Sequence, residues 1–216
     1  MNYQKINAEA IDTWCLDGWV WGQPISHELY QNAQKGEWDV LLTPTKAVPH
    51  EWFGSLCGKK VLGLASGGGQ QIPIFAALGA DCTVLDYSSQ QCASEQLVAD
   101  REGYPVTIIQ ADMTQPLPFE DGIFDLIFHP VSNCYIEKVE PVFQECYRIL
   151  KKGGVLLGGY DLGINYVFDE NEEYLTYSLP FHPLKNKKQY EDSMNPIFSH
   201  IRRTDRRTVK SWIPAY

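Results

Sequence analysis

Three consecutive glycines, Gly67 to Gly69, separate a short apolar segment from a predicted helix. Residues 61–64 are apolar in the manner of a buried parallel strand, and residues 70–78 have the pattern of a helix. A strand that ends in glycines and continues as a helix leaves backbone N–H groups exposed in front of the positive helix end. Glycine suits such a turn because a Cβ would block the close approach of a ligand and disfavour a positive φ. The turn therefore predicts a site for a nucleotide-type cofactor, with a tight turn that binds nothing as the alternative.

Three polar residues come directly after other predicted strands: Asp86, Asp112 and His129. The carboxyl ends of parallel strands meet at one edge of a sheet, so we expect these residues to lie near the glycine turn. A carboxylate accepts hydrogen bonds from ribose hydroxyls, and a histidine can take up a proton near neutral pH. The three residues therefore predict a ligand site at this edge of the sheet.

The elements that position these residues alternate regularly along the chain. Strands are expected over residues 61–64, 81–85, 106–110 and 123–128, with a fifth beginning at residues 155–157. Helices are expected over residues 70–78, 88–101 and 140–150, with Ser88 as an N-cap and the Lys-Lys-Gly-Gly of residues 151–154 as a helix stop. This alternation predicts an α/β fold with a doubly wound, mostly parallel sheet and helices on both faces.

Two classes of cofactor fit a glycine-rich first turn followed by an acid at the end of the second strand. A dinucleotide site has the pattern G-x-G-x-x-G, whereas residues 67–72 read Gly-Gly-Gly-Gln-Gln-Ile and lack the third glycine. A nicotinamide-dependent oxidoreductase is therefore the less favoured alternative. Asp112 and the pattern of residues 124–128 fit S-adenosylmethionine better.

The chain resembles class I S-adenosylmethionine-dependent methyltransferases, and within them a bacterial subgroup of small, mostly uncharacterised members. The resemblance covers roughly residues 55–160, and five stretches carry it in the family's order: VLGLASGGG at 61–69, VLDYS at 84–88, QADM at 110–113, FDLIF at 124–128 and LKKGG at 150–154. Residues 38–53 and 129–134 are similar to the subgroup. The resemblance implies a Rossmann-like methyltransferase fold and enzymatic methyl transfer from S-adenosylmethionine.

The same resemblance implies a role for each cofactor-binding residue. The glycine loop would hold the amino-acid part of the cofactor, and Asp86 would bind the ribose with Tyr87 beside the adenine. Asp112 would accept a hydrogen bond from the adenine amino group, and Met113 would pack on the ring. The complete expected set is Ala65, Ser66, Gly67, Gly69, Asp86, Tyr87, Asp112, Met113 and His129.

His129 is the candidate catalytic residue, because the resemblance places it near the methyl group. A general base helps only if the nucleophile must lose a proton, and a buried structural histidine is the alternative. Gly63 departs from the family, since many members carry there an acid that contacts the methionine amine. Residues 129–134 also differ from the Asn-Pro-Pro-Tyr type that positions amide or adenine nitrogens, which favours a small-molecule acceptor. A non-enzymatic S-adenosylmethionine-binding or regulatory protein is the second alternative.

Composition narrows the class of protein further. The 216 residues carry 27 acidic and 18 basic side chains, a net charge of −9, which disfavours nucleic acid or an anionic membrane as partner. The six cysteines show no C-x-x-C spacing, so we expect free thiols and no metal site. No segment has the apolar length of a membrane span, and the first residues lack the apolar region of a signal peptide. These features predict a cytoplasmic protein.

The sequence divides into three parts. Residues 1–58 contain five of the six tryptophans and two expected helices, 8–16 and 27–35, and we expect this aromatic-rich part to cover the cofactor as a lid. Residues 59–200 form the expected cofactor-binding methyltransferase domain, in which residues 161–200 read as an insertion near the active face. Residues 201–216 hold five of the 18 basic residues and form an atypical basic tail.

The tail has two interpretations. Members of the resembled subgroup continue differently after Phe198-Ser199-His200, and deleting two bases from a coding string for their continuation yields residues 200–216 of this chain. We therefore hypothesise a frameshifted end, which would remove the last helix and the closing antiparallel hairpin of the sheet. A genuine basic tail is the alternative.

Overall fold

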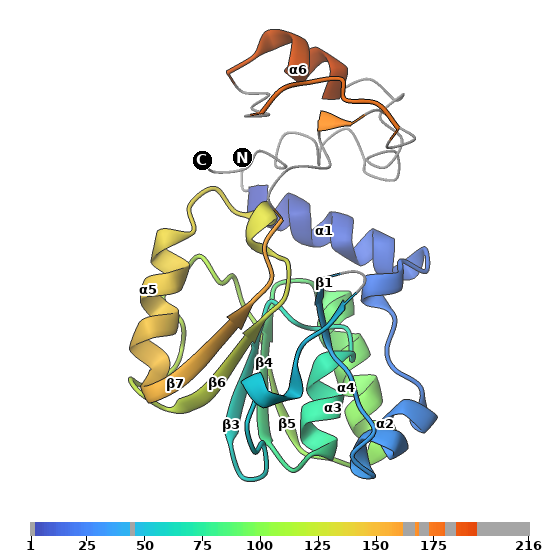
Figure 1. Ribbon diagram of the computed structural model, residues 1–216, viewed down its shortest axis with the longest axis vertical. Helices are drawn as coiled ribbons and strands as arrows, with labels where there is room; N and C mark the ends of the chain where they lie inside the picture. Colours follow the sequence, from blue (N-terminus) through green and yellow to red (C-terminus); the bar gives the residue numbers. More distant parts are fainter. Residues whose placement is uncertain (1–2, 44–45, 162–166, 169–172, 180–184, 194–216) are drawn as a thin grey trace.

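The computed structural model of the protein describes residues 3–43, 46–161, 167–168, 173–179 and 185–193 (Figure 1). Its centre is a five-stranded parallel sheet in the order β5-β4-β3-β6-β7. The strands are β3 (Lys60–Leu64), β4 (Asp81–Asp86), β5 (Val106–Gln110), β6 (Phe124–His129) and β7 (Leu150–Gly158). The predicted α/β fold with a parallel sheet is confirmed. The strand order reverses beside β3, which is where open sheets of this kind bind ligands.

Helices cover both faces of the sheet. They are α3 (Gln71–Ala77), α4 (Ser89–Glu102) and α5 (Glu140–Ile149). Figure 1 shows α5 on one side of the sheet and α3 and α4 on the other. Ser88 is the predicted N-cap of α4, because its Oγ accepts a hydrogen bond from the Gln91 N–H at 3.1 Å.

The expected start of the last strand was wrong. Residues 151–154 were assigned to a helix stop, but β7 begins already at Leu150, directly after α5. Leu150 pairs with Phe124, and Lys151 Nζ lies 2.7 Å from the Asp125 carboxylate of the neighbouring strand. These contacts with β6 hold the segment extended, whereas its residue types alone suggest a turn.

The core lies in two layers, one on each face of the sheet. Alternate residues of β3 supply both, since Val61 belongs to the layer beneath α3 whereas Leu62 and Leu64 belong to the layer beneath α5. All three are fully buried. This two-sided burial explains why β3 reads as a continuous apolar segment.

The first 58 residues form several short elements around one end of this core. They are α1 (Tyr3–Leu16), η1 (Val20–Gly22), α2 (His27–Gln34), the antiparallel pair β1 (Leu41–Thr43) and β2 (Lys46–Ala47), and η2 (His50–Trp52). The helix expected over residues 8–16 begins earlier, at Tyr3. Helix α1 lies across the carboxyl-end edge of the sheet, and α2 packs against α3 (Figure 1).

Less of the C-terminal part is described. Phe168 and Leu175 form an antiparallel bridge, and α6 covers Lys187–Ser193. The hypothesis of a frameshifted tail falls on residues 201–216, which lie outside the described residues. None of the helices in the described ranges is both long and apolar enough to cross a membrane.

Candidate functional site

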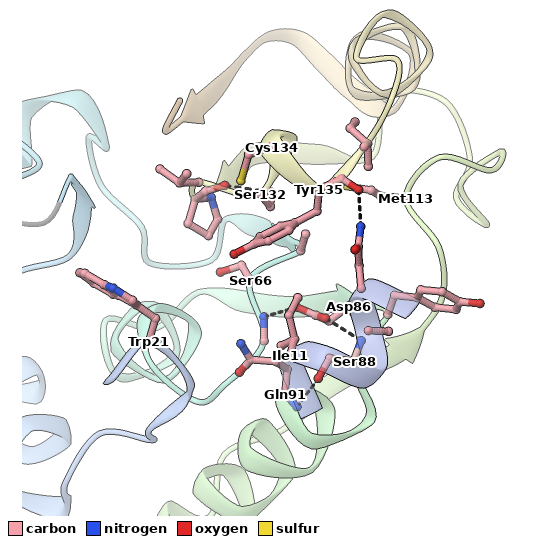
Figure 2. Close-up of a pocket in the computed structure, with 18 of the residues that line it drawn as sticks. Ile11, Trp21, Ser66, Asp86, Ser88, Gln91, Met113, Ser132, Cys134 and Tyr135 are labelled. Carbon is pink, nitrogen blue, oxygen red and sulfur yellow. Dashed lines mark hydrogen bonds between the residues drawn. The ribbon is translucent and has the colours of Figure 1, made fainter. Parts of the chain in front are cut away.

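A cavity of about 570 Å³ lies at the carboxyl ends of the strands, within the size range of small-molecule sites. Figure 2 shows Ser132, Cys134 and Tyr135 on one side of it, facing Asp86 and Gln91 on the other. Seven of the nine residues expected to bind the cofactor line the cavity: Ala65, Ser66, Gly67, Asp86, Tyr87, Asp112 and Met113. Gly69 and His129 do not line it.

The glycine turn is shaped by close contacts with α4. A Cβ on Gly67 would lie 2.7 Å from the Cβ of Gln91, and Gly68 and Gly69 have φ values of +96° and +68°. Larger residues would therefore meet both a steric and a conformational barrier. Ala65 adopts a φ of +48°, the one positive value among the described residues other than glycine. The turn thus brings backbone close to the cavity, as predicted from the sequence.

Asp86 connects the glycine turn with the start of α4. Its Oδ2 accepts a hydrogen bond from the Gly67 N–H and its Oδ1 one from the Ser88 N–H, both at 2.9 Å. Burial raises the pKa of Asp86, and the hydrogen bonds from these backbone amides oppose the rise. Asp86 is therefore held rigidly at the cavity wall, with further lone pairs available to a ligand.

Glu95 is a second carboxylate on the same turn, and the sequence analysis did not identify it. Its Oε2 accepts a hydrogen bond from the Gly69 N–H at 3.0 Å, and its Oε1 accepts one from the Tyr104 hydroxyl at 3.2 Å. The side chain is fully buried, and burial raises its pKa to about 7. Its position on α4 could have indicated that it is buried, because residue 95 lies on the same buried face of the helix as Val98.

Asp112 lines the cavity in the segment after β5. Its Oδ1 accepts hydrogen bonds from the N–H and the hydroxyl of Thr114, at 2.8 and 2.7 Å. Met113 beside it is buried. Both residues lie where the resemblance expects an adenine ring, but their contact with a ligand stays a prediction.

The departure at Gly63 has a structural explanation. A Cβ at this position would lie 2.8 Å from the side chain of Ile72, so α3 fills the space that an acidic side chain would need. Nearby polarity comes instead from Ser66 and Gln71, whose Oγ and Oε1 are joined by a hydrogen bond of 3.2 Å. Neutral groups thus line the cavity where the family resemblance leads one to expect an acid.

His129 lies behind the cavity wall and is fully buried. Its Nδ1 lies 2.8 Å from the carbonyl oxygen of Leu64, which can only accept, so Nδ1 carries the proton. Burial lowers the pKa of His129 and keeps the ring neutral. Its Nε2 lies 3.0 Å from Asn133 Oδ1, while Asn133 Nδ2 lacks a partner among the described residues. Two acceptors cannot share a hydrogen bond, so the amide nitrogen of Asn133 belongs in the place of Oδ1, where it donates to Nε2. This arrangement favours the structural interpretation of His129 over that of a base.

The first 58 residues form one wall of the cavity, and the sequence alone did not indicate which of their side chains would line it. Of its five tryptophans, Trp19 and Trp21 line the cavity, whereas Trp14 and Trp38 pack within the protein and Trp52 is 56% exposed. Further lining comes from α1 and β1, through Gln4, Asn7, Ala8, Ile11, Leu41 and Leu42. Residues of this part thus line the cavity, and their role as a lid over the cofactor stays a prediction.

The cavity is rich in hydrogen-bond acceptors. Its described lining includes Asp86, Asp112 and Asp161 and contains no Lys, Arg or His. Two buried acceptor atoms of its walls, Asn7 Oδ1 and Gln91 Oε1, find no partner among the described residues, which costs about 1–3 kcal/mol each. A ligand with positive charge and several N–H and O–H donors suits these walls, and S-adenosylmethionine has both. Nowhere in the described ranges do three or more His, Cys, Asp or Glu side chains form a group that could hold a metal ion.

The chain is similar to several known proteins. The profile of a family described as "Methyltransferase domain" matches residues 62–158. "Uncharacterized methyltransferase YbaJ" of Bacillus subtilis (strain 168) is 39% identical over 180 residues, 81% of this chain and 71% of that protein. "Sterol 24-C-methyltransferase ERG6B" of Gibberella zeae is 29% identical over 53% of this chain, which spans 30% of its length. Among solved structures, the PH0226 protein from Pyrococcus horikoshii OT3 is 30% identical, with a TM-score of 0.43 over 46% of this chain and 47% of that one.

Proposed function

The chain belongs to the class I S-adenosylmethionine-dependent methyltransferases, and we propose that it methylates a small molecule that is uncharged or cationic. The observation that carries the proposal is the cavity itself, whose described lining has three carboxylates and no cationic side chain. An anionic acceptor would enter this field without a counter-charge.

S-adenosylmethionine, when bound, supplies a methyl group activated by a positively charged sulfur. We assign its binding to the loop of residues 65–67 and to Asp86, Tyr87, Asp112 and Met113, as the family resemblance implies. Because the methyl group is already activated, the protein mainly aligns the acceptor for in-line displacement and excludes water. Trp19, Trp21 and Ile11 supply apolar surface for that purpose.

The acceptor would occupy the part of the cavity at the ends of β6 and β7. Cys134, Tyr135, Tyr160 and Asp161 line this part. Burial raises the pKa of the Cys134 thiol to about 12 and that of the Tyr135 hydroxyl well above 10, so both stay protonated at neutral pH. Asp161 is the carboxylate in this part of the cavity, and we assign it to face the acceptor.

We also propose a cytoplasmic location. All six cysteines are free in the structure. Free thiols, two of them buried, are what a reducing compartment maintains.

The test has two stages. Calorimetric titration with S-adenosylmethionine and S-adenosylhomocysteine, with NADH as control, should show binding of the first two alone. Transfer of a labelled methyl group should then be measured on sets of amines, alcohols, carboxylates and DNA oligonucleotides. Product from amines or alcohols supports the proposal, whereas transfer only to carboxylates or DNA contradicts it. A protein that binds the cofactor but methylates nothing in these sets would favour the regulatory alternative.

A further inference from the structure

The three glycines of the turn donate their N–H groups to other parts of the protein. The acceptors are Asp86 Oδ2 for Gly67, the Gln91 carbonyl oxygen for Gly68 and Glu95 Oε2 for Gly69, at 2.9, 2.9 and 3.0 Å. All three acceptors lie at the end of β4 or on α4. A turn that cradles a phosphate offers such amides to its ligand. In this protein the three amides instead fix the shape of the turn.

Glu95 is the acceptor of this set that does not line the cavity. Its side chain has no exposed surface, and buried carboxyl groups are rare unless they are paired. The groups that it pairs with are the Gly69 amide and the Tyr104 hydroxyl. An apolar side chain would fill the same space on α4 without the cost of burying a carboxyl group. The two hydrogen bonds therefore explain why an acid occupies this position.

The carboxyl group of Glu95 is held in one orientation. Its Oε1 accepts the hydrogen bond from Tyr104, whose ring stacks on that of Tyr30 with 5.6 Å between the ring centroids. Burial raises the pKa of Tyr104, so the hydroxyl keeps its proton and donates it. The other oxygen, Oε2, is thereby directed at the Gly69 amide.

Gly69 needs a constraint of this kind from outside the turn. A glycine exchanges between backbone conformations at little cost, so its residue type does not fix the turn. Gly69 is buried, and its carbonyl oxygen accepts a hydrogen bond from the Ile25 N–H at 2.9 Å. Without Glu95 its own N–H would have to rotate toward another acceptor. That rotation would displace the adjacent backbone of Gly67 and Gln70, which both line the cavity.

We propose that Glu95 is a positioning residue for the amino-acid part of the cofactor and that it acts by holding the Gly69 amide on the side of the turn away from the cavity. This inference rests on the proposed function, under which the glycine loop holds that part of the cofactor. It adds a residue outside the five stretches that carry the family resemblance. Because the ribose and the adenine are assigned to Asp86 and Asp112, we expect the effect of Glu95 to be confined to the amino-acid part.

The first experiment compares two ligands that differ in this part. S-adenosylhomocysteine carries it, whereas methylthioadenosine has the same nucleoside and sulfur without it. Glu95→Met keeps the length of the side chain and removes both acceptor oxygens. Calorimetric titration should show about tenfold weaker binding of S-adenosylhomocysteine and about the wild-type affinity for methylthioadenosine. The matched control is Gln96→Met, an exposed neighbour on α4, which should bind both ligands like the wild-type protein.

A second variant tests whether the acceptor oxygen carries the effect. Glu95→Gln keeps an oxygen that can accept from the Gly69 amide, so it should bind S-adenosylhomocysteine within about twofold of the wild-type affinity. Should Glu95→Met fail to fold by circular dichroism, Glu95→Leu replaces it and is judged by the same criteria.

Three outcomes would overturn the inference. They are unchanged affinity of Glu95→Met for S-adenosylhomocysteine, an equal loss for both ligands, and a loss that Glu95→Gln does not restore. An equal loss would show that Glu95 supports the whole site rather than the amino-acid part. A folded wild-type protein that binds neither ligand would instead contradict the proposed function.

Discussion

The two ends of the cavity are built differently. At the ends of β3 and β4, carboxylates hold the backbone, because Gly67 donates its N–H to Asp86 and Gly69 donates its N–H to Glu95. At the ends of β6 and β7, aromatic and apolar residues line the cavity and Asp161 is the carboxylate among the described lining. The first end has a rigid, polar form suited to one fixed ligand. The second offers mainly aromatic and apolar surface, which under the proposed function suits contact with the acceptor.

The largest effect is expected at the rigid end. Asp86→Ala removes the acceptor for the Gly67 and Ser88 amides and for the ligand, so S-adenosylhomocysteine should bind about 1,000-fold more weakly, or about 4 kcal/mol. Calorimetric titration measures this loss. Asp81→Ala, at the exposed start of the same strand, is the control and should bind normally. A loss below tenfold in Asp86→Ala would mean that the carboxylate only shapes the turn.

The second carboxylate of this end should make stability depend on pH. The pKa of Glu95 is raised from 4.5 to about 7 in the folded protein, so the folded state keeps its proton to a higher pH than the unfolded state. The stabilisation is complete below pH 4.5, and about 3 kcal/mol is lost as the pH rises through 7. Glu95→Gln lacks a titrating group and should lose less stability over this range.

Urea unfolding at several pH values from 4.5 to 8 measures this difference. The control is Glu120→Gln, an exposed position, which should follow the wild-type curve. Parallel curves for the wild type and Glu95→Gln would show that the buried carboxyl does not titrate in this range.

Stability and cofactor affinity, measured on a His129 variant, distinguish a structural role of this residue from a role in cofactor binding. His129→Leu leaves the Leu64 carbonyl without its N–H donor, which should lower the free energy of unfolding by about 2 kcal/mol. The affinity for S-adenosylhomocysteine should change less than threefold, because His129 does not line the cavity. Unfolding and titration at low temperature measure the two quantities. A large loss of affinity at unchanged stability would restore His129 as a cofactor contact.

The smallest effect on cofactor binding is expected at the ends of β6 and β7. Asp161→Asn should alter the affinity for S-adenosylhomocysteine less than twofold, whereas Asp112→Asn at the opposite end should weaken it about tenfold. Both are measured by the same titration. Equal losses in the two variants would show that the cofactor extends to the end of β7 and that the division of the cavity is wrong.

Residue types and their local spacing determined much of this protein. The glycine turn, the acids at the carboxyl ends of β4 and β5, and the N-cap at Ser88 depend on neighbours within a few residues, so they could be predicted directly. The parallel sheet also followed, because alternating strands and helices allow few other arrangements.

Tertiary structure decided what these elements contact. Glu95 supports the glycine turn because α4 packs beside the turn that follows β3, and its residue type alone does not distinguish it from an exposed helical acid. His129 lies behind the cavity wall because the Leu64 carbonyl, 65 residues earlier, holds its ring inside the core, so a role as base stays a prediction that this geometry does not favour. Asn7 lines the cavity because α1 packs against residues more than one hundred positions later in the sequence, such as Tyr135. Local periodicity determines where a helix or strand begins. Contacts between distant residues depend instead on how the helices and strands pack against one another, and this packing is determined by the whole sequence rather than by any one segment.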